Sequence, residues 1–448
     1  MSSKVFRDPL YNYVSIDLPR DKWLLDVVNS REIQRLRRIH QLGISNYTYP
    51  GAEHSRLVHS LGVLHLMQLA VDHFGRSHKE TQLDIARPIL LAAALVHDVG
   101  HGPFSHLFEP CLGIDHEHWT QLILLDSSCE IHRRLKACDG SLPQAVVDLI
   151  DSNNQDRPPW QKYLISSQLD MDRLDYLRRD SLFTGAGYGH FDWHRLITTM
   201  ELEGDAPNEW EIVWGSKARL AIEEYVFSRF YMYQNVYLHK TTRGFEQMVI
   251  AMWTRARQLK DQGSDISLIP AINAFWNSRE PTIGQFLAIE EFTVLGQIEA
   301  WRGHNDSGLS DLARRFLDRV PFAMIEPPES TNDLEIDLSE WENALSDFVR
   351  AHTTYNPDWM YCLKDTVKAK YNQPYFPEKE QDEQSVKNAI RVQADGGRPV
   401  EISTLMPRMR PLTVAPLPLV RYYVPSEIRT EVRHFRNEWT SSACKNVS

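Results

Sequence analysis

Hydrophobic side chains recur every three or four residues along most of the first 260 residues, a pattern that predicts a mainly helical protein. The clearest helical patterns cover residues 21–40, 61–74 and 85–96. The third is apolar on nearly every side, as expected of a helix buried at the centre of a domain. Weaker patterns predict further helices at 116–126, 142–152, 170–180, 217–260, 309–319 and 339–352.

Strand patterns are sparse. Runs at 210–214, 359–367 and 417–424 favour strands. The segment 329–349 carries seven acidic residues and no basic one and follows two prolines, so we interpret it as a linker that leads into a solvated helix. We therefore predict a mainly α protein with a helical core over 1–325 and a smaller C-terminal α+β lobe over 326–448.

The composition is that of an ordinary globular protein, with 42% hydrophobic and 24% charged residues. The net charge of −11 disfavours broad binding to duplex nucleic acid, although a small basic pocket for a phosphorylated metabolite is compatible with it. The longest apolar stretch, 89–96, is too short to span a bilayer. The first residues lack the apolar core of a secretory signal and the five cysteines form no CxxC pair, so we expect a reducing, cytoplasmic compartment.

Histidines gather in one part of the chain, where five of the 18 fall within the 22 residues from His97 to His118. The sharpest motif there is the run His-Asp-Val-Gly-His-Gly at 97–102, directly after the predicted buried helix. Adjacent His97 and Asp98 can reach one metal ion only where a helix ends or bends, and Gly100 would supply that freedom. Imidazole and carboxylate without thiolate suit a divalent Mn, Fe, Co, Ni, Zn or Mg ion and leave positions open for water and substrate.

Two further segments supply matching side chains. His59 stands just before a predicted helix, and the run 170–176 brings carboxylates, among them Asp170 and Asp172, to the start of another. Two sets of polar residues share a helix face through i, i+4, i+8 spacing. They are Asp172, Tyr176 and Asp180 in the first set, and Arg229, Tyr233 and Tyr237 in the second.

The order His59, His97-Asp98, Asp172 resembles the signature of the HD phosphohydrolase superfamily. The stretches 34–43, 49–52, 56–63 and 97–106 extend the resemblance to the deoxynucleoside triphosphate triphosphohydrolases, which include vertebrate SAM-and-HD-domain enzymes and bacterial relatives. The match covers roughly residues 8–260. It implies an HD-domain helical core in which His59, His97, Asp98 and Asp172 bind a divalent metal. It also implies attack of water at the α-phosphorus of a dNTP, which releases deoxynucleoside and intact triphosphate.

The resemblance further implies roles around the metal. His106 would protonate the departing 5′ oxygen, with His101 and Asp170 in the same catalytic set. Side chains implied to contact the phosphates are His116, Arg56, Arg173 and Arg229. Residues alone leave other interpretations open, since His106 could be a hydrogen-bonded core histidine and the arginines could lie on the surface.

On the sugar side, the resemblance implies that Gln41, Tyr176 and Asp180 bind the 3′-hydroxyl, while Leu42 and Tyr237 crowd the 2′ position. Tyr233 replaces a family histidine near the active site, which would alter substrate choice. The alternatives are that Tyr176 is a core residue and that Asp180 pairs with one of the neighbouring arginines, Arg178 or Arg179.

Asn29 stands where the guanine-activated vertebrate enzymes have an Asp, which argues against guanine activation and leaves another nucleotide effector open. Homo-oligomerisation is expected from the resemblance. Two rival functions are an HD phosphodiesterase or nuclease that acts on another nucleotide or on single-stranded nucleic acid, and a non-catalytic nucleotide-binding HD module. A complete set of metal ligands with His106 and the arginines argues against the module, since a binder needs no hydrolytic water.

Overall fold

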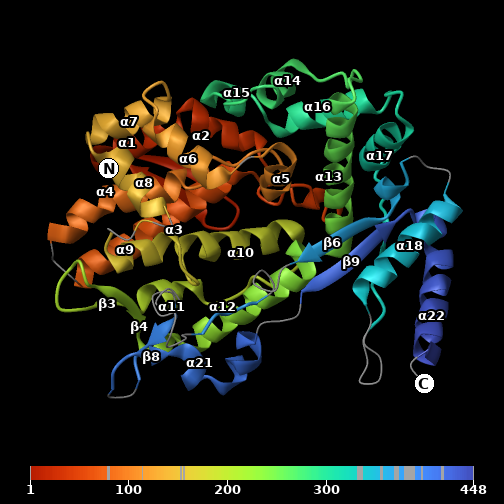
Figure 1. Cartoon of the computed structure of the whole chain (residues 1–448). Coiled ribbons are helices and arrows are strands. Elements are labelled where there is room, and N and C mark those ends of the chain that lie inside the picture. Colours follow the sequence, from red (N-terminus) through yellow and green to blue (C-terminus); the bar gives the residue numbers. More distant parts are fainter. Residues whose placement is uncertain are drawn as a thin grey trace.

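The computed structural model describes residues 2–77, 81–113, 115–151, 154, 157–329, 337–353, 357–367, 373–377, 389–394, 397–414 and 418–446. Most of these residues are helical, and the strands form three small sheets, two of which include strands from the C-terminal region (Figure 1). The prediction of a mainly α protein is therefore confirmed. Within the described residues, no helix is long and apolar enough to cross a membrane.

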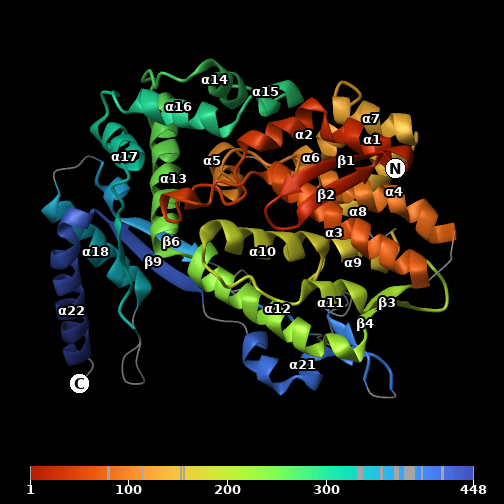
Figure 2. The ribbon, with the colours of Figure 1, turned by 180° about the vertical axis from the view of Figure 1, so that it is seen from behind.

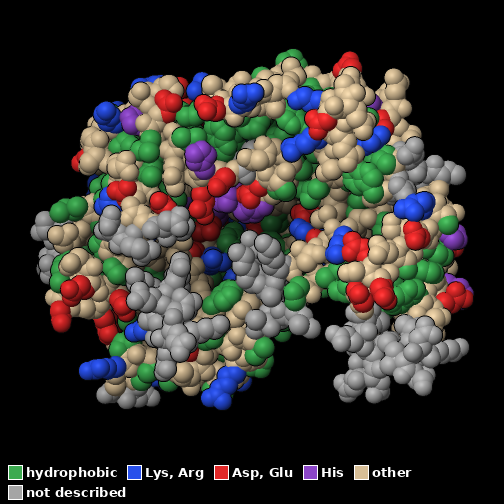
Figure 3. Space-filling view, viewed as in Figure 1, with side chains coloured by type: hydrophobic (Ala, Val, Ile, Leu, Met, Phe, Trp, Pro, Cys, Tyr) green, Lys and Arg blue, Asp and Glu red, His purple; other side chains and the backbone are tan. Residues whose placement is uncertain are grey.

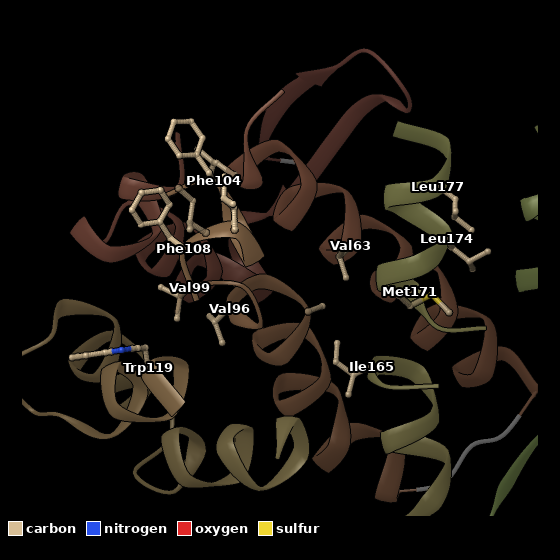
Figure 4. Close-up of a cluster of buried hydrophobic side chains, with 14 of the residues drawn as sticks. Val63, Val96, Val99, Phe104, Phe108, Trp119, Ile165, Met171, Leu174 and Leu177 are labelled. Carbon is tan, nitrogen blue, oxygen red and sulfur yellow. The ribbon is translucent and has the colours of Figure 1, made fainter. Parts of the chain in front are cut away.

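Three helices form the centre of the molecule: α3 (Arg56–Ser77), α4 (Thr81–Val96) and α10 (Met171–Thr184). α3 packs against both of the others. As its pattern predicts, α4 is buried on nearly every side along its second half. Figure 4 shows part of this core, with Val63, Val96 and Leu174 among the buried side chains. Burial of each such aliphatic side chain stabilises the fold by roughly 1.5–3 kcal/mol.

Shorter helices surround this centre. They are α5 (Phe108–Leu112), α6 (His116–Leu125), α7 (Glu130–Cys138), α8 (Leu142–Ile150), α9 (Pro159–Ile165) and α11 (Trp193–Thr198). α8 packs on α4, α6 and α9. The helices predicted at 116–126 and 142–152 are present, with ends slightly earlier than the pattern indicates.

The predicted helix 21–40 is broken. It consists of α1 (Leu18–Val28), α2 (Arg31–Arg35) and a 3-10 turn, Leu36–Arg38. The break falls at Ser30, whose backbone is extended and whose hydroxyl donates to the Val27 carbonyl at 2.6 Å. A serine that bonds the backbone in this way competes with helix continuation, which a hydrophobic pattern does not register.

The predicted helix 217–260 is broken as well. α12 (Arg219–Met232) runs into a π-helical turn, Tyr233–Tyr237, and α13 (Lys240–Asp261) begins afresh. The new start is capped by His239, whose ring nitrogen accepts from the Thr241 N–H at 3.2 Å. The side chains of the π turn therefore no longer follow the ideal helical spacing that the sequence pattern assumes.

An N-terminal hairpin was not predicted. β1 (Ser3–Asp8) pairs antiparallel with β2 (Asn12–Asp17), and Asn12 at the turn has φ 65°. A second sheet has the order β3 (Met200–Glu203), β4 (Glu211–Trp214), β7 (Arg391–Val392), β8 (Val400–Glu401). The strand predicted at 210–214 is therefore present as β4, joined to strands that the sequence pattern missed.

The third sheet has the order β5 (Ala323–Ile325), β9 (Leu419–Val424), β6 (Leu363–Val367). The strands predicted at 417–424 and 359–367 are present in part. Residue 417 lies outside the described residues, and Asp358–Tyr361 is a 3-10 turn. Neighbouring tyrosines of β9 face opposite sides, since Tyr423 contacts Gly244 of α13 and the ring of Tyr422 lies 6.5 Å from that of Trp341.

The remaining helices are α14 (Pro270–Trp276), α15 (Ile283–Leu287), α16 (Glu291–Trp301), α17 (Ser307–Leu317), α18 (Leu338–His352), α21 (Ile402–Leu405) and α22 (Arg429–Asn446). The helices predicted near 309 and 339 are α17 and α18, while much of the predicted linker before α18 lies outside the described residues. Figures 1 and 2 show α13 on one side of the third sheet and α18 with α22 on the other. Two sheets join strands from before and after residue 325, so the division of the chain there stays a prediction.

Candidate active site

The four predicted metal ligands, His59, His97, Asp98 and Asp172, lie together, and we refer to them as the metal group. His59 lies in the first turn of α3, His97 and Asp98 directly follow α4, and Asp172 is in the first turn of α10. An oxygen of Asp172 lies 2.9 Å from His59 Nε2 and 3.6 Å from His97 Nε2, and His97 Nε2 lies 3.4 Å from an Asp98 oxygen. The three central helices thus bring together residues more than 100 positions apart in the sequence.

These side chains fit a divalent cation. The Nε2 atoms of His59 and His97 are buried, and neither forms a well-aligned hydrogen bond within the described residues. Metal–ligand bonds of about 2.1 Å place neighbouring ligands of a six-coordinate ion about 3 Å apart, close to the separations in the metal group. Two ring nitrogens that face carboxylate oxygens at this spacing are what a metal site requires.

Asp175, which the sequence interpretation did not single out, orients His59. Its Oδ2 lies 2.8 Å from His59 Nδ1, and Arg179 donates to both of its oxygens at 2.8 and 2.9 Å. Burial opposes the charge, but Arg179 and His59 outweigh it and hold the pKa of Asp175 below its usual range. Arg179 also pairs with Asp8 at the end of β1, so the hairpin supports this arrangement. A carboxylate behind a ligand histidine fixes the ring and its tautomer.

Arg56 lies against the metal group. Its Nη1 is 2.5 Å from an oxygen of Asp98, and its Nε and Nη2 donate to the Ser105 hydroxyl at 3.0 and 2.7 Å. Burial raises the pKa of Asp98, but Arg56 and the neighbouring histidines outweigh burial and hold that pKa well below its usual range. The resemblance implies that Arg56 lies near the phosphates, and in the structure it is bonded to Asp98, one of the four predicted ligands.

Gly100 is required because a side chain would not fit, and not for the conformational freedom that the sequence analysis expected. Its backbone is not in the left-handed region, and an added Cβ would lie 2.2 Å from the His116 carbonyl and 2.3 Å from the Thr120 nitrogen. The loop that follows His97 and Asp98, which we refer to as the HD loop, packs closely on α6 and therefore leaves no space for a side chain at Gly100. The left-handed residues of this loop are Phe104 and Ser105, with φ 53° and 56°.

Glu291, at the start of α16, holds two loops of the site. Its Oε1 accepts from the backbone N–H groups of His40 and Phe104 at 2.7 and 3.1 Å, and its other oxygen contacts His40 Nδ1. Ser105, next to Phe104, donates to the His40 carbonyl at 3.0 Å. The sequence interpretation missed Glu291 because it lies about 250 residues away along the chain from the first of the loops it holds.

A second set of side chains, His101, His106, Glu109 and His116, adjoins the metal group, and we refer to it as the histidine–glutamate group. One oxygen of Glu109 lies 2.8 Å from His106 Nδ1 and 2.6 Å from His116 Nδ1. The rings of His101 and His116 stack at 4.1 Å, and His101 Nε2 lies 3.3 Å from an Asp98 oxygen. The side chain of His106 is 68% exposed, which excludes the alternative of a core histidine. Glu109 was missed, although its place three residues after His106 is a helical spacing that could have indicated it.

Asp180 links two polar side chains that come from other parts of the chain. Its oxygens lie 2.7 Å from His54 Nε2 and 2.8 Å from the Tyr237 hydroxyl. Gln41 donates its backbone N–H to the His54 carbonyl at 2.9 Å, and its side-chain oxygen is buried without a hydrogen bond among the described residues. Arg179 is engaged with Asp175 and Asp8, so the alternative in which it pairs with Asp180 is not what the structure shows.

Figure 3 shows histidine and acidic side chains gathered around a hollow in the middle of one face. Comparisons with known proteins agree with this chemistry. The HD domain family model matches residues 56–180, which contain the whole metal group. The uncharacterised protein YwfO of Bacillus subtilis is 40% identical over 323 residues, which cover 72% of each chain. The chain belongs to the HD-domain, dNTPase-like protein family.

A second sequence and a solved structure are also similar to this chain. The deoxynucleoside triphosphate triphosphohydrolase SAMHD1 of Homo sapiens is 28% identical over 286 residues, which cover 56% of this chain and 44% of that protein. A crystal structure of a phosphohydrolase from Bacteroides thetaiotaomicron superposes with a TM-score of 0.76 at 26% identity and covers 94% of this chain and 99% of that one. This HD-domain protein is a metal-dependent hydrolase.

Five of the ten predicted phosphate- and sugar-binding residues of the HD-domain protein form a third set, the tyrosine–arginine group. It comprises Arg173, Tyr176, Arg229, Tyr233 and Tyr237. The ring of Tyr237 lies 6.0 Å from that of Tyr176 and 4.9 Å from that of Tyr233, and the guanidinium of Arg229 lies 5.3 Å from the Tyr233 ring. Burial raises the pKa of the Tyr233 phenol, but Arg229 and Arg173 outweigh it, so that this pKa is lowered. Arg229 also donates to the Pro374 carbonyl.

Two predicted residues have evident structural contacts, and their functional assignments stay predictions. Asp170 is buried and caps α10, accepting from the Arg173 and Ser167 N–H groups at 2.8 Å each. Burial, the largest influence, raises the pKa of Asp170 to about 6. Leu42 is half-buried against the hydrophobic core beside Gln41.

Proposed function

We propose that this protein hydrolyses dNTPs to deoxynucleoside and inorganic triphosphate. The observation that carries the proposal is the composition of one face of α10. Asp172 of the metal group, Arg173 beside it, Tyr176 one turn on and Asp180 one turn further follow one another along the helix. A proposed metal ligand, a cation for the phosphates and a carboxylate for the sugar thus follow one another along α10. This is the order in which a nucleotide presents its phosphates and its sugar. Relatives named as deoxynucleoside triphosphate triphosphohydrolases support the same substrate class.

A divalent ion held by the metal group would lower the pKa of a bound water and polarise a phosphoryl oxygen. The cations of the chain then supply charge around the phosphates. Arg173 and Arg229 flank the Tyr233 phenol. The two guanidinium groups and the phenol can all donate to phosphate oxygens. Arg56, bonded to Asp98, would hold that carboxylate in its ligand orientation while it remains close to the substrate.

The leaving oxygen needs a proton. The water oxygen forms a bond to the α-phosphorus, the bond from phosphorus to the 5′ oxygen breaks, and the departing oxygen takes a proton from His106. Glu109 lies 2.8 Å from His106 Nδ1 and orients the ring, which leaves the other ring nitrogen to donate. An exposed imidazole backed by a carboxylate suits such an acid.

Residues at the other end of the proposed substrate would distinguish deoxyribose from ribose. Gln41 has a buried side-chain oxygen without a partner among the described residues, and such an atom gains most from a hydroxyl donor. Asp180 is already joined to His54 and Tyr237, so its position is fixed before a nucleotide binds. Leu42 and Tyr237 would crowd the 2′ position and disfavour ribonucleotides.

The test is product analysis. Metal-loaded protein is incubated with each dNTP, each NTP and a short single-stranded oligonucleotide, and products are separated by ion-exchange chromatography. Deoxynucleoside with intact triphosphate is expected. Nucleoside monophosphates released from the oligonucleotide would favour a nuclease, and absence of turnover with Mn, Fe, Co and Mg would favour a non-catalytic nucleotide-binding module. Titration of other nucleotides, followed by light scattering, tests the predicted effector and homo-oligomer.

A ligand variant tests the metal group directly. Asp172→Ala is expected to lose both metal content and activity, because its carboxylate approaches both ligand histidines. Asp72→Ala removes an exposed carboxylate from α3 and serves as the matched control. Full metal content in Asp172→Ala would contradict the ligand assignment.

A further inference from the structure

The histidine–glutamate group has the composition of a second metal site. One ligand atom from each of its four side chains lies within 4.8 Å of all the others. Three imidazoles and one carboxylate is a donor set that zinc, cobalt and nickel favour over magnesium or calcium. The side chains come from the HD loop, a 3-10 turn, α5 and the first turn of α6, so the fold rather than one helix assembles them.

The position of Glu109 is central to this arrangement. A single oxygen, Oε1, approaches both His106 Nδ1 and His116 Nδ1, at 2.8 and 2.6 Å. A cation bound between these three atoms would replace the protons that now link them. Zinc bonds to nitrogen and oxygen are about 2.0–2.2 Å long, so small side-chain rotations would suffice to admit the ion.

An independent observation concerns His101. The residue is 3% exposed, and its Nδ1 is buried without a hydrogen bond among the described residues. Its ring is stacked on that of His116, another member of the group, which fixes its position. A buried ring nitrogen that forms no hydrogen bond destabilises the fold unless a ligand binds to it. The Nδ1 atom of His101 therefore indicates a bound ligand at this position.

We propose that the histidine–glutamate group binds a second, zinc-type cation, distinct from that of the metal group, and that its occupancy inhibits hydrolysis. The inhibition rests on the proposed function, because a metal ion on His106 Nδ1 prevents the ring from becoming an imidazolium, and a neutral, metal-bound ring gives up the proton of its other nitrogen to the leaving oxygen far less readily. The binding does not rest on it. His101 joins the two groups, since its Nε2 lies 3.3 Å from Asp98, but the two sets share no ligand.

Metal stoichiometry tests the binding. Purified full-length protein is stripped with chelator, dialysed against zinc and assayed by mass spectrometry for zinc per chain. We expect two ions in the wild type, one in Glu109→Ala, one in Asp172→Ala and none in the double variant. His118→Ala, which removes an exposed histidine from α6, should retain two. One ion in the wild type, or two in Glu109→Ala, overturns the proposal.

The remaining ion in Glu109→Ala also reports that the variant is folded. Cobalt provides a second measurement, because a four-coordinate Co²⁺ site absorbs visible light more strongly than a six-coordinate one. The stronger band should appear with the second equivalent in the wild type and with the first equivalent in Asp172→Ala, and should be absent in Glu109→Ala. A spectrum identical in the wild type and Glu109→Ala contradicts the second site.

Inhibition is measured separately on the wild type. If a general acid is removed, dNTP hydrolysis should fall by about 100-fold as zinc rises from one to two equivalents per chain. A mild chelator that withdraws the second ion should restore the rate. Undiminished activity at two equivalents refutes the inhibition. If no dNTP is hydrolysed under any condition, the proposed function fails, while the stoichiometry still decides whether the second site exists.

Discussion

Asp175 is a buried carboxylate that supports the metal group from behind His59. It accepts from His59 Nδ1 and is itself held by two bonds from Arg179. The charge on Asp175 strengthens the basicity of the ligand ring and fixes its orientation. The carboxylate is fully buried, so its charge has no solvent to screen it.

Asp175→Asn is therefore expected to weaken metal binding by roughly 10–100-fold while the metal ligands themselves are unchanged. Affinity is measured by competition with a fluorescent chelator, and circular dichroism checks the fold. Asp72→Asn, on the exposed side of α3, is the control. Equal affinity in the two variants would mean that His59 needs no carboxylate behind it.

His40 provides a pH-dependent contribution to stability. Burial lowers the pKa of His40, but its contacts with Glu291 and Glu53 outweigh burial, so the pKa is raised in the folded protein. A raised pKa means that the folded state favours the protonated ring. The stabilisation is complete below the unfolded-state pKa of about 6.5 and is lost as pH rises through the higher folded-state value.

His40→Gln should therefore reduce the free energy of unfolding by more at pH 5.5 than at pH 9, with a difference on the order of 1 kcal/mol. Urea denaturation at the two pH values measures it, and His118→Gln, which alters an exposed histidine, is the control. The same loss at both pH values would show that the contacts of His40 do not depend on its charge.

At the residue scale, spacing in the sequence indicated the candidate metal ligands more readily than the residues that support them. His59, His97, Asp98 and Asp172 could be named because their order and helix positions are local features of the chain. Glu291 could not be identified with the same rules, since it reaches its partners only through tertiary packing. Asp180 was singled out from the sequence as part of a polar set, but its partner His54 comes from a loop that no periodicity describes.

At the scale of elements, Gly62 determines how closely α3 approaches α10. A Cβ at this position would lie 2.0 Å from an oxygen of Asp175 and 2.4 Å from Arg179 Nη2. Gly75, on the same helix, has nothing within 4 Å of an added Cβ. The two glycines differ in environment and not in backbone conformation, since neither has a positive φ.

Gly62→Ala should destabilise the protein by about 1–3 kcal/mol through overpacking, and it should also weaken metal binding because Asp175 must move. Gly75→Ala should stabilise the helix by about 0.5–1 kcal/mol, because alanine loses less backbone entropy. Chemical denaturation measures both, and chelator competition measures the metal. A stable Gly62→Ala with normal affinity would show that α10 can move away from α3 at little cost.

Hydrophobic periodicity predicted that helices exist but not where they stop. The long patterns at 21–40 and 217–260 continue across breaks set by Ser30 and His239, because buried stripes persist on both sides of each break. The π turn over Tyr233–Tyr237 displaces Tyr237 from ideal helical spacing with Arg229. The hairpin β1–β2 was missed because its short strands expose most of their side chains and carry a weak pattern.

At the scale of the whole molecule, the C-terminal segment is built into the core. β9 pairs with β5 and β6, and β7 pairs with β4. Gln168 and Phe376 exchange two hydrogen bonds of 2.7 Å, close in sequence to the start of α10. Sequence patterns separate segments by composition, and they carry no information about strands that pair over long stretches of the chain.

A chain that ends at residue 325 is therefore expected not to fold on its own. Its β5 would lose the partner strand β9, and buried polar groups such as Arg315 would lose Glu427. In the full-length chain, Asp365→Ala should cost on the order of 2 kcal/mol, because Arg243 of α13 loses a buried, charged hydrogen-bond partner while it keeps Glu246. Circular dichroism and thermal unfolding test the shortened chain and Asp365→Ala, and Asp347→Ala, which removes an exposed carboxylate from α18, is the control. A cooperative transition of the 1–325 chain near that of the full protein would instead establish the helical core as an independent domain.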